Sequence, residues 1–115
     1  MKNLTTINHL KQQFSIPNFV EKTIRQFNKD GLGLMDSEVS MSAIEATDVL
    51  GELIIEVKAI LRYLDEVSHL QQFVYKVDLP EKAWQYFLSF QNFESLAEEI
   101  IIREAQKVYL REMFK

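Results

Sequence analysis

The chain has 115 residues, enough for one domain, and 47% of them are hydrophobic, the share of an ordinary globular protein. The absence of cysteine excludes disulfides and cysteine-bound zinc, and the net charge of −4 disfavours binding to the phosphates of nucleic acid. The chain has no signal-peptide pattern at its start and no apolar run longer than three residues, so we expect one soluble cytoplasmic domain over residues 1–115, without membrane contact.

Two short amphipathic helices are predicted before residue 31. Apolar residues recur at helical spacing over residues 4–14 and again over residues 16–27. Pro17 suits the first turn of the second helix, where a backbone N–H is not needed. Asp30-Gly31 indicates the end of this helix, with Gly31 in the left-handed conformation that a β-carbon would resist. Residues 31–41 are then expected to form the one long connection of the chain.

A long helix is predicted from about residue 42 to residue 67 or beyond. Ser42 is followed three residues later by Glu45, which is the pattern of a capping box. Apolar residues then alternate spacings of four and three, a heptad pattern typical of one helix packed along another: Ala46, Leu50, Leu53, Val57, Ile60, Leu64 and Val67. An unbroken helix to residue 77 would be about 54 Å long, whereas a domain of this size is about 35 Å across. We therefore expect a break near residues 67–70, with projection into a dimer as the alternative.

Two more helices are predicted after residue 77. The sequence Asp78-Leu79-Pro80-Glu81 places an N-cap acid and an early proline at the start of a short aromatic helix. Asn92 or Ser95 is expected to cap the last helix, which runs to about Met113. That helix is apolar nearly all round, so it should be central in the bundle or shared with a partner. The predicted fold is an all-α bundle of four to five helices, with the long helix and the C-terminal helix as its core pair.

Four acidic residues form a stripe along the predicted long helix: Glu45, Asp48, Glu52 and Glu56. They fall within about 80° of one another around the helix axis, and stacked carboxylates are ligands of the kind that Mg²⁺ prefers. Glu45-x-x-Asp48 also resembles an ExxD pair of the all-α nucleotide pyrophosphohydrolases of the MazG and dimeric dUTPase type, although no ExxE pair precedes it. The resemblance implies metal-dependent hydrolysis of a nucleotide, with these four residues as metal ligands. A solvated helix face is the favoured interpretation of the same stripe.

Glu104 is predicted to be a buried acid. It lies within an apolar stripe of the last helix, and Arg103, Lys107 and Arg111 are within two turns of it. A buried glutamate must be paired or protonated. A structural ion pair or a place at a subunit seam is favoured over a role as an active-site acid.

The favoured functional hypothesis is a small acidic, non-catalytic helical protein that acts through protein–protein contacts, as a regulator or inhibitor does. The first candidate partner is a second copy of the chain, and no cofactor or catalytic residue is expected. The aromatic residues Tyr86 and Phe90 spread beyond one helix face, which also suggests a protein contact. The predicted interface consists of apolar residues of the two core helices: Leu50, Leu53, Val57, Ile60, Leu64, Ile102, Tyr109 and Met113. The alternative is the metal-dependent enzyme described above.

Overall fold

The structure, a computed structural model, describes residues 7–31, 33–35 and 37–114. Within these ranges the chain forms seven helices and no strand, which confirms the predicted all-α fold. The helices are α1 (Ile7–Gln13), α2 (Pro17–Asp30), α3 (Ser37–Ile44), α4 (Val49–Glu66), α5 (Leu70–Val77), α6 (Glu81–Phe90) and α7 (Phe93–Met113). Among these residues, no helix is both long enough and apolar enough to cross a membrane.

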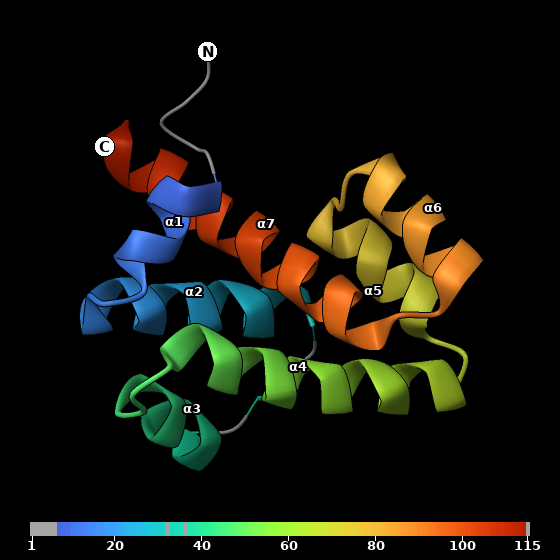
Figure 1. Cartoon of the computed structure of the whole chain (residues 1–115), viewed down its shortest axis with the longest axis horizontal. Coiled ribbons are helices and arrows are strands. Elements are labelled where there is room, and N and C mark those ends of the chain that lie inside the picture. The colour runs from blue at the N-terminus through green and yellow to red at the C-terminus, as the bar shows by residue number, and fades with distance from the viewer. Residues whose placement is uncertain (1–6, 32, 36, 115) are drawn as a thin grey trace.

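Helix α7 is the centre of the bundle and packs against α1, α2, α4, α5 and α6 (Figure 1). Its buried residues lie on several of its sides: Leu96, Ala97, Ile100, Ile101, Ile102, Glu104, Ala105 and Val108. A helix that is apolar nearly all round can be covered only by neighbours on several sides. The predicted cap and end of this helix are also confirmed, since Asn92 accepts a hydrogen bond from the backbone N–H of Ser95, and the helix ends at Met113.

The predicted long helix is shorter at its start than expected. Residues 37–44, which overlap the expected connection 31–41, form α3, and α4 begins only at Val49. The prediction that a capping box at Ser42 and Glu45 starts the long helix is therefore wrong. Instead, the Asp48 carboxylate accepts a hydrogen bond of 3.0 Å from the backbone N–H of Gly51 and caps α4. This extra helix, together with the separate α5, raises the number of helices above the expected four to five.

The far end of α4 confirms the predicted break. Helix α4 ends at Glu66, α5 begins at Leu70, and Ser68 between them has a left-handed backbone with φ 63°. An 18-residue helix is about 27 Å long, so it fits within the 37 × 35 × 24 Å extents of the molecule. The buried residues of α4 face the core that it shares with α7 and follow helical spacing: Leu53, Val57, Leu61 and Leu64.

Two predicted helix ends have a different local structure. Gly31 follows α2 but has φ −116°, so it does not adopt the left-handed conformation that was expected. A β-carbon at Gly31 would lie 2.7 Å from the Phe73 ring, so this position needs glycine for space. Asp78 does not cap α6, because it ends α5 in a left-handed conformation and binds Arg103 of α7. Pro80 is the residue that precedes α6, with no side-chain cap.

Candidate functional site

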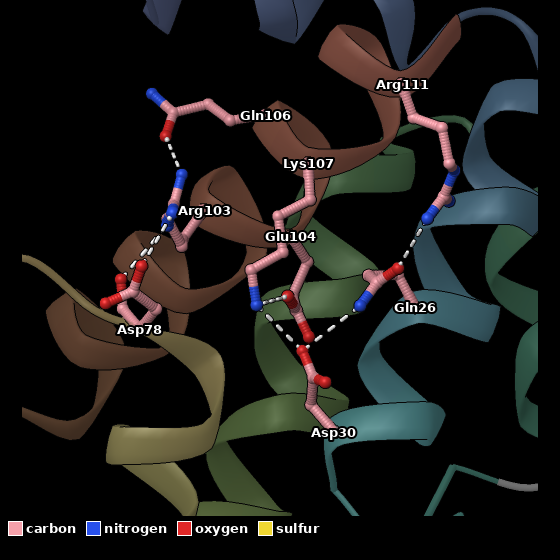
Figure 2. Close-up of polar contacts among 8 residues, drawn as sticks. All are labelled: Gln26, Asp30, Asp78, Arg103, Glu104, Gln106, Lys107 and Arg111. Atoms are coloured by element: carbon pink, nitrogen blue, oxygen red, sulfur yellow. Dashed lines mark hydrogen bonds and ion pairs between the residues drawn. The ribbon is translucent and has the colours of Figure 1, made fainter. Parts of the chain in front are cut away.

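A polar cluster connects α2 to the centre of α7 (Figure 2). Helix α2 contributes Gln26 and Asp30 near its C-terminus, and α7 contributes Glu104, Lys107 and Arg111 on one side. The side chain of Glu104 is completely buried, as its place in the apolar stripe predicts. Only the packing of α2 on α7 brings the five residues together, because the two α2 residues are at least 74 positions away in the chain from the three α7 residues.

Lys107 is the link between the two carboxyl groups. Its Nζ atom lies 2.8 Å from Asp30 Oδ2 and 3.0 Å from Glu104 Oε1. The contact with Asp30 is a hydrogen bond, whereas the one with Glu104 lacks hydrogen-bond geometry and is electrostatic. Gln26 Nε2 also donates to Asp30 Oδ2, at 3.2 Å, and Arg111 Nη1 donates to Gln26 Oε1, at 3.0 Å. Lys107 and Gln26 thus both donate to Asp30, and Gln26 is itself held by Arg111.

The two carboxyl groups differ in protonation. Burial raises the pKa of Glu104 from 4.5 to about 8, and the neighbouring Asp30 adds to the rise, although Lys107 acts against it. Burial would also raise the pKa of Asp30, but hydrogen bonds from Lys107, Glu104 and Gln26 outweigh burial and lower it. At neutral pH the proton is therefore on Glu104 and the negative charge is on Asp30. The Glu104 carboxyl lies directly beside Asp30 in Figure 2, so the proton and the negative charge are on neighbouring groups.

This arrangement is better suited to holding α2 against α7 and to binding a ligand than to acid catalysis. A general acid must reach the atom that it protonates, and Glu104 has no exposed surface. Asp30 is different, because it lines a pocket of about 130 Å³ between the end of α2, the end of α4 and α5. The pocket is lined by Asp30, Gly31, Leu64, His69, Gln72, Phe73 and Lys76. Sequence reasoning missed it because three separate helices supply its walls and no local motif marks them.

The predicted metal ligands do not lie along one helix. Glu45 and Asp48 lie before α4, and only Glu52 and Glu56 are within it, because the helix starts at Val49. Asp48 already uses its carboxylate to cap α4. In the part of the chain that the structure describes, no three residues among His, Cys, Asp and Glu are grouped so that they could hold a metal ion.

The predicted interface residues are mostly covered by the chain itself. Four of them are buried in its own core: Leu53, Val57, Leu64 and Ile102. Three are partly buried and packed against that core: Leu50, Ile60 and Tyr109. Tyr109 also forms a 3.0 Å hydrogen bond between its hydroxyl and His9 Nε2. Met113 is 46% exposed. A surface for a partner must therefore include other residues.

Helix α6 is one of the places where the bundle leaves apolar side chains uncovered, as it also does at Ile55, Tyr75 and Phe114. Phe87 is its one buried residue, and Phe87 packs edge-to-face on Phe93 of α7, with ring centres 5.0 Å apart. Tyr86, Leu88 and Phe90 are 47%, 49% and 67% exposed.

No protein-family model, curated protein or solved structure matches this chain. A role for α6 or for the pocket therefore has to be argued from the geometry of this chain alone.

Proposed function

We propose that the chain is a non-catalytic protein that acts by binding a protein partner, in the first place a second copy of itself, through the exposed face of α6. The observation that supports this proposal is the width of the apolar face of α6. At 100° per residue, the face runs from Tyr86 through Phe87 to Leu88, an arc of about 200°. Helix α6 packs mainly against α7, which covers only the middle of that arc. Exposed aromatic residues of this kind are enriched at protein interfaces.

A second copy is favoured as the partner because one edge of α6 is self-complementary. Lys82, Tyr86 and Phe90 follow one another at intervals of four residues and so form one stripe, and the rings of Tyr86 and Phe90 lie 4.7 Å apart. In a twofold dimer, the same patch of each copy meets its counterpart, so two α6 helices would lie antiparallel. Lys82 of each copy would then lie over the Phe90 ring of the other, a favourable cation–π contact. The two Tyr86 rings would meet at the twofold axis.

The alternative, a metal-dependent enzyme that hydrolyses nucleotides, remains a prediction with less support. That hypothesis needs four carboxylates on one continuous helix face, and the structure divides them between a turn and α4. The helix-capping hydrogen bond of Asp48 also competes with its use as a metal ligand.

The mass of the protein in solution tests the proposal. We expect analytical ultracentrifugation of the wild-type chain to give twice the monomer mass of 13.5 kDa as the concentration rises. The double variant Tyr86→Ser/Phe90→Ser should remain a monomer, with an unchanged melting temperature at low concentration because both side chains are exposed. Lys82→Glu should weaken the dimer by removing the cation–π contact.

The matched control is Ile55→Ser, which removes an apolar side chain that is 58% exposed on α4. This variant should dimerise like the wild type. The proposal would be refuted by a wild-type chain that stays monomeric up to millimolar concentration. It would also be refuted by a dimer that the α6 double variant leaves intact.

A further inference from the structure

The pocket beside Asp30 is a groove along one face of α5. His69, Gln72, Phe73 and Lys76 occupy positions i, i+3, i+4 and i+7, so their side chains form a row from the start of α5 to its last turn. The end of α2 lies opposite the middle of this row, since a β-carbon on Gly31 would touch the Phe73 ring. The end of α2 and α5 thus face each other across the groove, Leu64 of α4 adds to its lining, and none of these residues belongs to the α6 surface.

The floor of the groove is apolar and rigid. Leu64 and Phe73 are only 3% and 5% exposed. The Phe73 ring is held edge-to-face by Phe27 of α2, with ring centres 5.4 Å apart. An apolar floor of this kind, with a few polar groups at its edge, is typical of sites for small molecules.

Opposite charges flank this floor. Asp30 is adjacent to Gly31, on which a β-carbon would meet the Phe73 ring, and Lys76 follows Phe73 by three residues on the next turn of α5. Lys107 and Gln26 both donate to Asp30 Oδ2, which leaves Oδ1 as a second acceptor on the same carboxylate (Figure 2). Because these donors hold the carboxylate in one orientation, a ligand would lose little free energy in ordering it. Asp30 is also ionised at neutral pH, since its pKa is lowered.

We propose that this groove binds a small zwitterion with an apolar body, of the size and chemistry of a free aliphatic amino acid. The ammonium group of the ligand donates to Asp30 Oδ1, its carboxylate pairs with Lys76, and its apolar body packs on Leu64 and Phe73. A cation alone has no group to pair with Lys76, and an anion alone has no donor for Asp30 Oδ1. Only a ligand that carries both charges satisfies both side chains.

Titration of the ¹⁵N-labelled chain with L-leucine, followed by NMR, tests this inference. We expect saturable shifts of the backbone amides of Gly31 and of residues 69–76. Two analogues serve as comparisons: 3-methylbutylamine, which lacks the carboxylate, and 4-methylpentanoate, which lacks the amine. Each should bind at least about tenfold more weakly than L-leucine, because each loses one charge-assisted contact.

The variant Lys76→Gln should weaken L-leucine binding about tenfold and leave the fold intact, because Lys76 is exposed. The same variant should not weaken the binding of 3-methylbutylamine, which has no group for Lys76 to pair with. Lys29→Gln is the matched control, since Lys29 is also an exposed lysine near the end of α2 but does not line the groove. The inference is overturned if L-leucine causes no saturable shift, if either analogue binds as tightly as L-leucine, or if Lys76→Gln has no effect. None of these results depends on whether α6 forms a dimer.

Discussion

The substitution Glu104→Gln should change how the stability of this protein depends on pH. Glutamine has nearly the shape of a protonated glutamate, but it has no proton to lose. In the folded wild-type chain, the pKa of Glu104 is raised from 4.5 to about 8. Between these two pH values the folded state holds a proton that the unfolded state has released. The free energy of unfolding of the wild type therefore falls as the pH rises through this window, and it levels off above pH 8.

The size of this effect follows from the two pKa values. At about 1.4 kcal/mol per pH unit, the window from 4.5 to about 8 corresponds to a loss of up to about 5 kcal/mol. That loss is a large part of the total stability of a domain of this size, which is about 5–15 kcal/mol. Glu104→Gln should therefore be close to the wild type near pH 5 and clearly more stable near pH 9. Asp30 affects the stability of both proteins at acidic pH, because its pKa is lowered in the folded state. The stability that it contributes is present above pH 3.8 and is lost as the pH falls through its lowered pKa.

Urea unfolding from pH 5 to pH 9, followed by Trp84 fluorescence and circular dichroism, measures how the free energy of unfolding of the wild type and of Glu104→Gln depends on pH. The control is Glu66→Gln, which neutralises an exposed carboxylate at the end of α4 and should leave the slope with pH unchanged. Parallel profiles for the wild type and Glu104→Gln would refute the reasoning, because they would mean that Glu104 titrates alike in the folded and unfolded chains. A Glu104→Gln variant that is less stable at pH 9 would refute it too.

Three further substitutions test the packing, each by urea unfolding at pH 7. Leu61→Ala should destabilise the chain by about 2–5 kcal/mol, because Leu61 of α4 is completely buried in the core. A loss below about 1 kcal/mol would contradict that placement. Asn92→Ala should cost about 1 kcal/mol through the lost cap of α7, whereas Asn92→Ser should retain most of the stability. Gly31→Ala should cost about 1–3 kcal/mol, because the added β-carbon meets the Phe73 ring at 2.7 Å. A neutral Gly31→Ala would show that the ring moves aside freely.

Several features of the fold follow from local patterns in the sequence. The all-α class, the break near residues 67–70 and the cap at Asn92 were all predicted correctly, since each depends on side chains within a turn or two of one another. The burial of Glu104 was also predicted, because the apolar stripe around it leaves no polar face for it to occupy.

The predictions that failed concern competition between local alternatives. Both Ser42 with Glu45 and Asp48 are plausible starts for a helix, and in the structure α4 starts after Asp48, with α3 packed against it. Gly31 was correctly expected at a helix end, but its reason is the space taken by Phe73, which is 42 residues away in the chain. A local pattern carries no information on such a distant neighbour.

The sequence by itself thus determined the helical class, most helix ends and the presence of an acid in the core. Tertiary structure alone brought Asp30 beside that acid and formed the walls of the pocket, because Asp30 meets Lys107 across 77 residues. It also decided which apolar residues remain exposed. The heptad pattern predicted that the long helix packs along the C-terminal helix, and α4 does pack on α7, with Leu53, Val57 and Leu64 buried. Helix α6 keeps exposed aromatic residues. Periodicity shows which side of a helix must be covered, whereas the contacts between helices determine what covers it.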